Sequence, residues 1–226
     1  MIPIIVLARL GSTRFPRKHM QLLGGKLLIA GIIERAQEHS EAVVLATSQK
    51  SENNDLVDVA MEMAAGHVRG PDHDVWFRVL TAAQMFGYSR WIVWLGDCPF
   101  VDHRILESVI SAMEDPEIDA DYFVAQPPFN GIEGVMIQGW TWRGWVELGR
   151  DLAEKPEYVE CPWQLRDDRK SHSAPVDWRD LAATPIKASI DYPLELAIAN
   201  RVVAHIGHWP TEYDELISAY QDIKEL

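Results

Sequence analysis

Short apolar runs alternate with amphipathic segments through the first half of the chain. The runs are rich in β-branched residues and too short for typical helices, as expected for buried strands. The segments between them repeat apolar residues at helical spacing. The pattern predicts strands over 2–8, Ala42–Thr47, His67–Arg69 and Trp91–Leu95, and helices over Leu27–His39, Asn53–Ala65, Val75–Phe86 and His103–Met113. Strands that alternate with helices in this way predict βαβ units and a mainly parallel sheet.

The second half of the chain is less regular. The same reasoning predicts strands over Tyr122–Ala125, Gly134–Ile137 and Ile186–Ile190, and helices over Trp142–Leu152, Leu194–Ala204 and Glu212–Lys224. The stretch 154–170 is mixed and polar. Because no repeat, low-complexity tract or linker divides the chain, we expect a single α/β domain over 1–226.

Composition narrows the class of protein. Of the 226 residues 47% are hydrophobic, and the formal net charge is −13, which argues against a nucleic-acid partner. The longest apolar runs, 2–8 and Trp91–Leu95, are far shorter than the roughly 20 residues that span a bilayer. No basic segment precedes the first run, so we expect neither a signal peptide nor a membrane partner. Cys98 and Cys161 alone do not imply a disulfide framework, and we expect a cytoplasmic protein.

Four cations surround a flexible turn directly after the first predicted strand. Arg9, Arg14, Arg17 and Lys18 flank Gly11–Thr13. Small residues let backbone N–H groups approach phosphate oxygens, while Arg and Lys neutralise phosphate charge. A solvated basic turn is the alternative, but this local charge in an acidic chain favours a phosphorylated ligand that is bound with a divalent ion. The turn has neither the P-loop pattern nor the dinucleotide-binding pattern. It leaves a strand at the edge where open α/β sheets bind ligands.

The motif Arg9–Lys18 resembles the nucleotide-binding loop of cytidylyltransferases that make CMP-activated sugars. It reads R-x-x-S-T-R-F-P-x-K, and Leu22–Leu28 continues it with a Gly-Gly-Lys step. The spore-coat polysaccharide biosynthesis group has the most similar loop, and the CMP-Kdo and CMP-sialate synthetases are its cousins. The resemblance implies a Rossmann-like three-layer α/β/α fold with a mainly parallel mixed sheet, as in glycosyltransferase-A-like nucleotide-diphospho-sugar transferases. It covers 1–115, returns at Ser189–Asn200 and is weak between them.

Two aspartates that follow predicted strands are candidates for a Mg²⁺ site. Asp97 comes directly after a buried strand, and magnesium is usually held by one or two carboxylates with phosphates and water. The segment Gly96–Asp102 resembles the family signature G-D-C-P-L-I-D, which implies that Asp97 binds the metal, while Asp102 suits a helix N-cap. Asp191 lies in an element similar to the family's S-[IVL]-D-T-P-E-D-L, which implies a second metal ligand. A helix cap is the alternative for Asp191.

The resemblance also implies a set of nucleotide contacts. Arg14 and Lys18 are expected on the triphosphate, and with Asp97 they form the expected catalytic set. Backbone groups near Ala8–Arg9 are expected to read the base. The expected nucleotide-binding residues are Ala8, Arg9, Gly11, Ser12, Thr13, Arg14, Lys18, Thr47, Asp74 and Asp97, and the expected metal ligands are Asp97 and Asp191.

Some of these positions have a structural interpretation that is equally good. Thr47 ends a predicted strand, so a base contact and an ordinary strand-end turn are equally favoured. Asp74 either accepts a hydrogen bond from a ribose hydroxyl or caps the next helix. Arg78, one turn later, is expected to face a carboxylate such as Asp74. Trp76 is expected in the core and His73 at the surface.

The acceptor is expected to bind in the segment 120–180, where we find no specific motif. Tyr158–Trp163 resembles the family's R-E-H-V-T-P-Y faintly and departs from it at the Arg, Glu and His. Arg143, Arg166 and Arg169 are candidates to hold an acceptor carboxylate or phosphate. A surface position is the alternative for each of them.

Tryptophan is the most unusual feature of the composition. The chain has nine tryptophans, and Trp140, Trp142 and Trp145 cluster in the second half. The resemblance implies a homodimer, and tryptophan is enriched at interfaces. We therefore expect the subunit interface and the acceptor site in 120–180, with the nucleotide and metal site in 1–115 and 185–205.

The implied activity is transfer of CMP from CTP to an acidic sugar of the sialic, legionaminic, pseudaminic or Kdo type. It uses Mg²⁺, releases pyrophosphate and serves surface polysaccharide biosynthesis. Two alternatives remain: a catalytically reduced nucleotide-binding protein of the same fold, and a glycosyltransferase that consumes a nucleotide sugar. The second class normally carries a D-x-D motif after the strand, and Asp97–Pro99 is not one.

Overall fold

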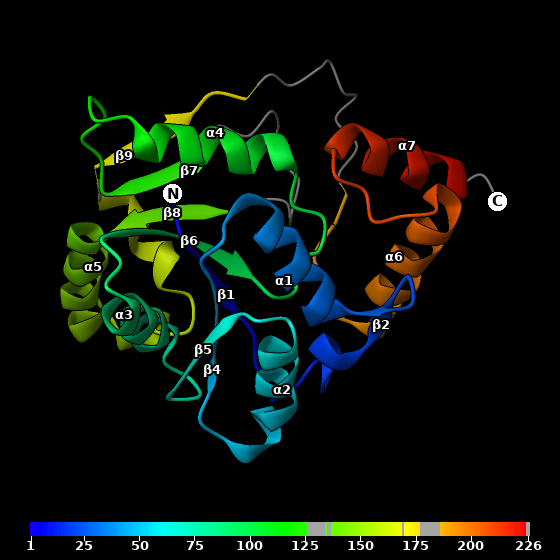
Figure 1. The fold of residues 1–226 in the computed structure, drawn as a ribbon, viewed down its shortest axis with the longest axis horizontal. Coiled ribbons are helices and arrows are strands. Elements are labelled where there is room, and N and C mark those ends of the chain that lie inside the picture. The colour runs from blue at the N-terminus through cyan, green and yellow to red at the C-terminus, as the bar shows by residue number, and fades with distance from the viewer. Residues whose placement is uncertain (126–133, 135–136, 169, 177–185, 225–226) are drawn as a thin grey trace.

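A mixed β-sheet forms the centre of the computed structural model, which describes residues 1–125, 134, 137–168, 170–176 and 186–224 (Figure 1). In sheet order its strands are β5 (Gly66–Gly70), β4 (Val43–Ser48), β1 (Ile4–Leu7), β6 (Arg90–Leu95), β8 (Gln138–Thr141), β7 (Tyr122–Ala125) and β9 (Ser171–Ala174). All neighbouring strands are parallel except β8, which is antiparallel to both β6 and β7. The mainly parallel mixed sheet predicted from the sequence is confirmed.

Helices follow most of the strands, as the apolar periodicity predicts. They are α1 (Leu28–His39), α2 (Asn54–Glu62), α3 (Val75–Phe86), α4 (His103–Glu114), α5 (Trp142–Glu154), α6 (Pro193–Ile206) and α7 (Tyr213–Lys224). A small hairpin of β2 (Leu22–Leu23) and β3 (Lys26–Leu27) precedes α1, and short 3₁₀ helices lie at Lys18–Met20, Ser51–Asn53, Pro156–Tyr158 and Pro162–Asp168. Among the described residues no helix is long and apolar enough to cross a membrane.

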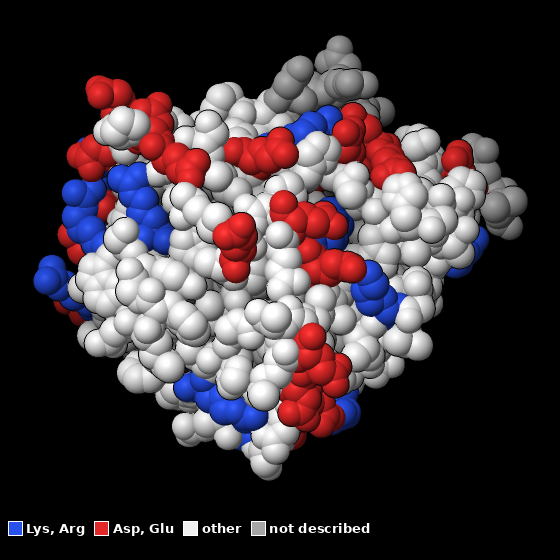
Figure 2. All heavy atoms as spheres, viewed as in Figure 1, with Lys and Arg blue, Asp and Glu red and all other residues white. Residues whose placement is uncertain are grey.

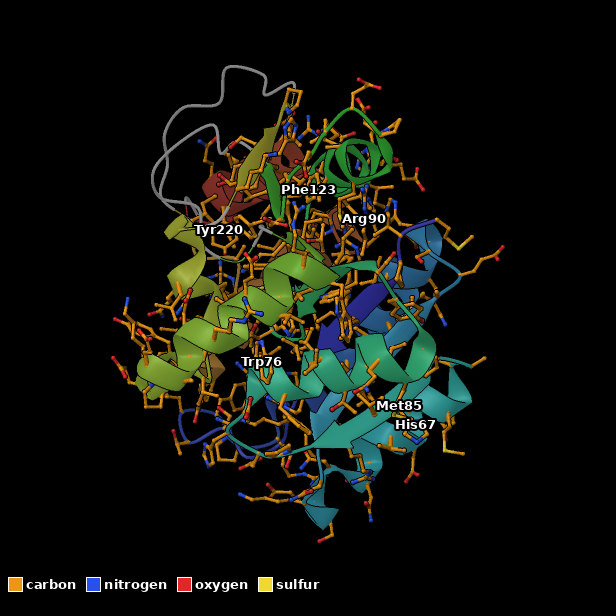
Figure 3. The ribbon with its side chains drawn as sticks, turned by 90° about the vertical axis from the view of Figure 1, so that its left-hand side faces the viewer. His67, Trp76, Met85, Arg90, Phe123 and Tyr220 are labelled. Atoms are coloured by element: carbon orange, nitrogen blue, oxygen red, sulfur yellow. The ribbon has the colours of Figure 1, made fainter. Side chains whose placement is uncertain are left out.

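Successive side chains of the central strands point to opposite faces of the sheet, and helices cover both faces, which gives three layers. Ile4 and Val6 of β1 belong to one buried cluster, which α1, α2 and α4 cover. Ile5 and Leu7 belong to a second cluster on the other face, which α3 and α5 cover. Both faces of β1 are buried, as expected for a central parallel strand. Figure 3 shows α3 and α5 side by side on the second face.

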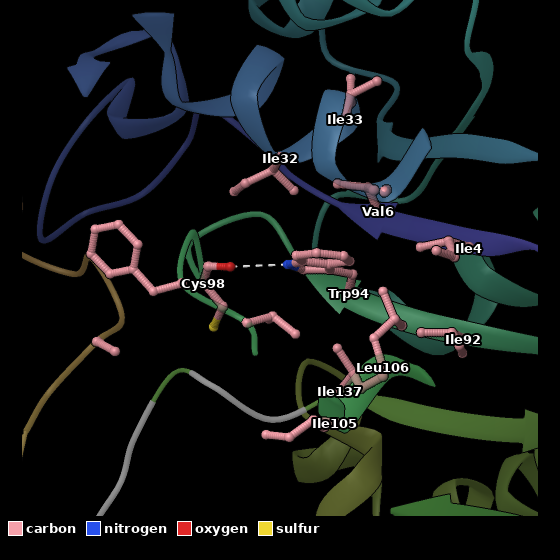
Figure 4. Packing of buried hydrophobic residues seen from close by; sticks show 14 of the residues in the cluster. Ile4, Val6, Ile32, Ile33, Ile92, Trp94, Cys98, Ile105, Leu106 and Ile137 are labelled. Carbon is pink, nitrogen blue, oxygen red and sulfur yellow. Dashed lines mark hydrogen bonds between the residues drawn. The ribbon is translucent and has the colours of Figure 1, made fainter. Parts of the chain in front are cut away.

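Tryptophans are the largest fully buried side chains in these two clusters. Trp94 of β6 lies among the aliphatic side chains of the first cluster, and its Nε1 donates to the Cys98 carbonyl at 2.9 Å (Figure 4). Trp76 lies between α3 and α5, where its Nε1 donates to the Trp145 carbonyl at 2.8 Å (Figure 3). Both indoles satisfy their one donor, and the ring of Trp94 is fully buried. Trp76 is partly buried and packs against the second cluster, so it lies at the edge of the core in which it was expected.

Two predicted strands in the second half are corrected. The segment Ile186–Ile190 joins no sheet strand and has only an isolated bridge at Lys187. Its backbone is instead held by a loop, because Ile190 N donates to the Asp97 carbonyl at 2.8 Å. The strand predicted over Gly134–Ile137 is displaced, because β8 covers Gln138–Thr141. Residues 135–136 lie outside the described part. The edge strand β9 is polar and was not predicted.

Candidate active site

A pocket of about 860 Å³ opens at the carboxyl ends of β1 and β6, which is the edge of an open α/β sheet where ligands bind. Its lining combines the turn after β1, the loop after β6, the start of α3 and the segments around Glu160 and Asp191. The lining residues include Leu7, Ala8, Arg9, Gly11, Ser12, Thr13, Arg14, Lys18, His19, His73, Val75, Arg78, Asp97, Cys98, Glu160, Cys161, Trp163, Gln164, Ser189 and Asp191.

A glycine lets the two strands end side by side. Gly96 N donates to the Leu7 carbonyl at 2.8 Å, and a Cβ on Gly96 would lie 2.6 Å from that oxygen. Real Cβ atoms do not approach a carbonyl oxygen so closely, so a larger residue would push the loop after β6 away from β1. Asp97 then follows directly in the pocket.

The turn after β1 is fixed at its ends and open at its centre. Leu10 N donates to Asn53 Oδ1 at 2.8 Å, and Arg17 N donates to the Leu10 carbonyl at 3.1 Å. Within the described residues, the backbone amides of Gly11–Thr13 have no intramolecular acceptor. These amides lie at the pocket wall and are free to bind an anion.

Two carboxylates from distant segments converge on one ammonium group. Lys18 Nζ lies 2.7 Å from Asp97 Oδ2 and 3.3 Å from Asp191 Oδ1. Arg14 Nη2 also reaches Asp191 Oδ1 at 2.6 Å, and Lys187 Nζ lies 3.0 Å from Asp191 Oδ2. Three cations therefore surround two carboxylates. Lys18 is the most enclosed of them, since its side chain is only 6% exposed.

Asp191 is held in its charged form. Burial alone would raise its pKa, but the hydrogen bond from Lys187 and the charges of Lys18 and Arg14 outweigh burial, and the pKa lies below its ordinary value. The carboxylate does not cap α6, because Tyr192 is the N-cap residue of that helix and the Asp191 oxygens contact the three cations instead. The structure thus brings Asp191 to Asp97, as the metal-site hypothesis requires, and the cap alternative is wrong.

The donor set of the pocket suits Mg²⁺. Asp97 and Asp191 both reach a single position, that of Lys18 Nζ, so both carboxylates can serve one small cation. Among the described residues no group of three or more His, Cys, Asp or Glu side chains is placed to hold a metal. Magnesium does not need one, because it takes one or two carboxylates and completes its shell with phosphates and water.

Buried charges hold the loop that carries Asp97. Arg35 of α1 donates to the carbonyls of Pro99 at 2.6 Å and Val101 at 2.8 Å. Asp102 is fully buried, accepts from Arg104 N at 2.8 Å and so caps α4. The predicted cap at Asp102 is confirmed. Burial lowers the pKa of Arg35, and burial would raise that of Asp102 if Arg104 did not lower it.

A second charged group closes the other side of the pocket. Arg9 donates from Nη2 to Glu160 Oε2 at 2.9 Å and from Nη1 to the Asp72 carbonyl at 2.8 Å. His73 also contacts Glu160. These contacts join the turn after β1 to the irregular segment 156–168, although about 150 residues separate Arg9 from Glu160 in sequence. Sequence reasoning placed Glu160 in the acceptor segment but did not predict its contact with Arg9.

Two buried bases that face the pocket have nitrogen atoms without a hydrogen-bond partner in the described structure. Arg78 is 3% exposed, and the structure gives its Nε and Nη1 no hydrogen-bond partner. His19 is 4% exposed and its Nδ1 has none either. Burial and the nearby Arg9 lower the pKa of Arg78 to about 10, and burial and Lys18 lower that of His19 to about 4. At neutral pH Arg78 is therefore charged and His19 neutral.

Two predicted nucleotide contacts are not brought to the pocket. Thr47 is fully buried in β4 and does not belong to the lining. Asp74 is used as the N-cap of α3, since its carboxylate accepts from Phe77 N at 2.7 Å. The expected pairing of Arg78 with Asp74 is also absent among the described ion pairs.

Of the residues predicted for the acceptor site and the subunit interface, those that the structure describes do not line the pocket. Arg143 is occupied by Asp119 at 2.8 Å and Asp121 at 2.5 Å and does not line the pocket. The Arg166 side chain and all of Arg169 lie outside the described residues. Trp140 and Trp145 are fully buried in the second cluster, so their predicted place in a subunit interface is wrong.

The molecular surface is unevenly charged. Figure 2 shows Asp and Glu side chains in several groups across one face, with Lys and Arg in smaller groups between them. The pocket lining, by contrast, combines four cations, Arg9, Arg14, Lys18 and Arg78, with three carboxylates, Asp97, Glu160 and Asp191. The lining is therefore slightly basic, although the whole chain has a net charge of −13.

The chain is similar to known proteins over more than half of its length. The family model of the cytidylyltransferases matches residues 3–133. The spore coat polysaccharide biosynthesis protein SpsF of Bacillus subtilis is 30% identical over 165 residues, which are 70% of this chain and 67% of that protein. The 3-deoxy-manno-octulosonate cytidylyltransferase of Anaeromyxobacter dehalogenans is 35% identical over 116 residues, 50% of this chain and 47% of that protein.

The fold is shared with solved structures. A cytidylyltransferase from Leptospira borgpetersenii superposes with a TM-score of 0.84 at 19% identity, over 99% of this chain and 95% of that one. The chain spans about two thirds of SpsF and about half of the 3-deoxy-manno-octulosonate enzyme. The part matched by the family model includes the turn after β1 and the loop after β6, with Arg14, Lys18 and Asp97, but not Glu160 or Asp191.

Proposed function

Because this chain belongs to the cytidylyltransferase family, we propose that it transfers CMP from CTP to an acidic sugar in surface polysaccharide biosynthesis. A hydroxyl oxygen of the sugar attacks the α-phosphorus, the bond to the β-phosphate oxygen breaks, and pyrophosphate leaves. The hydroxyl proton passes to water. The single observation that carries the proposal is the convergence of Lys18 and Arg14 on Asp97 and Asp191 at the sheet edge.

The cations of the pocket match the charge that this reaction develops. Lys18, Arg14 and the open amides of Gly11–Thr13 all line the pocket. Together they offer positive charge and N–H donors to the transferring phosphate and the departing pyrophosphate. The protein needs to supply positioning and electrostatic stabilisation rather than a covalent intermediate.

Asp97 and Asp191 would hold Mg²⁺. When bound there, the ion would neutralise phosphate charge and lower the pKa of the attacking hydroxyl. The fit of this donor set means that no separate side-chain base is needed. In the free protein Lys18 balances the two carboxylates, and with nucleotide its ammonium group would turn to the phosphates.

The acceptor would bind against the irregular segment. Glu160, Cys161, Trp163 and Gln164 line this part of the pocket, and Ser189 faces it from the segment that ends at Asp191. An acidic sugar is supported by the relatives, since one of them is a 3-deoxy-manno-octulosonate cytidylyltransferase. A homodimer stays a prediction, with Trp142 as the member of the predicted tryptophan cluster that remains exposed, at 38%.

Pyrophosphate release tests the proposal directly. The full chain is incubated with Mg²⁺, each of the four ribonucleoside triphosphates and a panel of acidic keto-sugars, with an Asp97→Asn variant as the inactive control. Release with CTP and one sugar supports the proposal. Tight CTP binding without release from any sugar would indicate the catalytically reduced alternative, and failure to bind any nucleotide would refute the proposal.

A further inference from the structure

An exposed aromatic ring lies beside the charged pocket without belonging to the core. Tyr192 is 46% exposed and is a member of neither buried cluster of the described residues. It follows directly on Asp191 and is the N-cap residue of α6, a position that favours Ser, Thr, Asp and Asn. The similar family element has threonine there. Neither core packing nor helix capping therefore explains a tyrosine at this position.

Two cations that hold Asp191 also contact this ring. The guanidinium carbon of Arg14 lies 5.5 Å from the centroid of the Tyr192 ring, and Lys187 Nζ lies 5.7 Å from it. Both distances are within the roughly 6 Å over which the face of an aromatic ring attracts a cation. The same two cations bind the Asp191 carboxylate, Arg14 at 2.6 Å and Lys187 at 3.0 Å. Asp191 and Tyr192, consecutive in sequence, thus share both cations.

The backbone that carries the ring is fixed. Pro193, whose φ is restricted, is the first residue of α6. Glu195 Oε2 accepts from Asp191 N at 2.5 Å and from Tyr192 N at 2.9 Å. Arg14, by contrast, has a long side chain that is 54% exposed. The ring is therefore placed to restrain the arginine rather than the reverse.

Stacking and ion pairing use different parts of the guanidinium group. The bond to Asp191 occupies Nη2 of Arg14. Contact with a ring uses the face of the group and leaves its N–H donors available for phosphate oxygens. Asp191 is also a proposed Mg²⁺ ligand, so its charge would no longer be available to Arg14 in the loaded site. The contact with Tyr192 would still restrain Arg14 there.

We infer that Tyr192 is a positioning residue that keeps Arg14 at the triphosphate once Arg14 has left Asp191. The inference rests on the proposed function, in which Arg14 binds the phosphates. A side chain that is already restrained loses less conformational entropy on binding than a free one. In the free protein Asp191 restrains Arg14 as well, so the ring contributes more to the loaded state than to the empty one. The ring therefore strengthens nucleotide binding.

Nucleotide binding in a double-mutant cycle tests the inference without any sugar. CTP affinity is measured by calorimetry with Mg²⁺ for the wild type, Tyr192→Leu, Arg14→Met and the double variant. We expect Tyr192→Leu to weaken CTP binding by about two- to fivefold, the range for a cation–π contact at an exposed site. In the Arg14→Met background the same substitution should have no further effect, because the ring then has no guanidinium group to hold.

Further variants separate the ring from other roles of Tyr192. Tyr192→Phe keeps the ring and removes the hydroxyl, so it should keep most of the CTP affinity. Tyr192→Thr removes the ring and supplies a favoured N-cap residue, so it is a second ring-free variant that should bind CTP like Tyr192→Leu. Melting temperatures show whether each variant folds.

The matched control is Phe86→Leu. Phe86 is 43% exposed, stacks on Tyr88 with 5.7 Å between the ring centroids, and lies outside the pocket lining. Its substitution removes a half-exposed, stacked ring of similar size and should leave CTP affinity as in the wild type.

Three results would overturn the inference. Unchanged CTP affinity in the folded ring-free variants would mean that the ring does not hold Arg14 for the nucleotide. An equal loss in the Arg14→Met background would mean that Tyr192 acts without Arg14. A loss in Tyr192→Phe as large as in Tyr192→Leu would assign the effect to the hydroxyl. In each of these cases the wild type still binds CTP and the proposed function stands, whereas a wild type that binds no nucleotide refutes both.

Discussion

Replacing Lys18 with methionine should affect the two charged ligands of the pocket in opposite directions. The ammonium group attracts the triphosphate, but in the free protein it lies against both proposed metal ligands, 2.7 Å from Asp97 Oδ2 and 3.3 Å from Asp191 Oδ1. Methionine keeps the length and most of the volume of the side chain and removes the charge. We therefore expect weaker CTP binding and stronger binding of a divalent cation.

The magnitudes follow from the contacts. A charge-assisted hydrogen bond contributes about 1.5–3 kcal/mol, so CTP affinity should fall about 10- to 150-fold. A unit charge about 4 Å from a divalent ion is repelled by about 2 kcal/mol even at the dielectric constant of water, so cation affinity should rise about 30-fold.

Stability changes less than for a typical buried ion pair. Removing one partner of a buried pair is destabilising by about 3–5 kcal/mol, but here Asp191 keeps Arg14 and Lys187. Asp97 is a quarter exposed, at 25%, and can be hydrated. We expect a loss of about 1–2 kcal/mol in the free energy of unfolding, which is in the middle of the range for single substitutions.

Manganese is a convenient probe for the cation, because free Mn²⁺ is measured by electron paramagnetic resonance. Mn²⁺ binding is titrated without nucleotide, CTP binding is measured by calorimetry, and unfolding is followed in urea. Lys26→Met serves as the matched control, since Lys26 pairs with Glu34 outside the pocket. Its variant should match the wild type in both binding measurements.

The CTP measurement and the Mn²⁺ measurement test the triphosphate site and the cation site separately. If CTP affinity is unchanged, the turn after β1 is not the triphosphate site. If Mn²⁺ affinity is unchanged or lower, Asp97 and Asp191 are not the cation site, whatever happens to CTP. A loss of both affinities in a folded variant would mean that Lys18 is needed to shape the site rather than to balance its charge.

Three further predictions address single groups. Asp97→Asn should abolish Mg²⁺-dependent pyrophosphate release while the melting temperature stays near the wild-type value, and retained turnover would remove Asp97 from the metal site. His19→Gln should flatten the pH dependence of unfolding: burial, then Lys18, lower the folded pKa from 6.5 to about 4, so the unfolded chain binds a proton first and stability falls with pH from about 6.5 through 4. The wild type should therefore lose about 2 kcal/mol more than the variant between pH 7 and pH 5 in urea titrations, and equal losses would show that His19 titrates normally. Glu160→Gln should free Arg9 and raise CTP affinity by about fivefold at most, the range for a half-exposed ion pair, whereas a fall in calorimetric affinity would mean that Glu160 shapes the nucleotide site.

The nucleotide-binding half was predictable because its strands are buried on both faces. Such strands appear as unbroken apolar runs, and β1, β4 and β6 lie within a residue or two of their predicted positions. The charged turn after β1 and Asp97 were found by the same logic, because both follow directly on such runs. Asp191 needed the resemblance, since the sequence alone favours a helix cap at that position.

In the second half of the chain, the strand prediction over Ile186–Ile190 was wrong because alternating burial there is not accompanied by pairing with a sheet strand. Ile186, Ala188 and Ile190 are all buried at 3% or less, which is the period-2 pattern of a strand. Period 2 reports burial of one face, however, and not which backbone is the partner. Here the backbone bonds to the loop after β6 and to the Tyr220 hydroxyl, so the extended segment crosses the end of the sheet and carries Asp191 to the pocket.

Arg78 shows how a charged residue can be misassigned when two local interactions compete for one carboxylate. The i, i+4 rule predicts that Asp74 pairs with Arg78, and such a pair is worth about 0.3–0.5 kcal/mol at a helix surface. Capping the helix N-terminus is worth about 0.5–2 kcal/mol, and Asp74 accordingly accepts the Phe77 N–H. Because the cap is the stronger use of the carboxylate, Arg78 is left to turn into the pocket. An arginine whose only local partner already caps its helix is thus, from sequence alone, a candidate for binding a ligand.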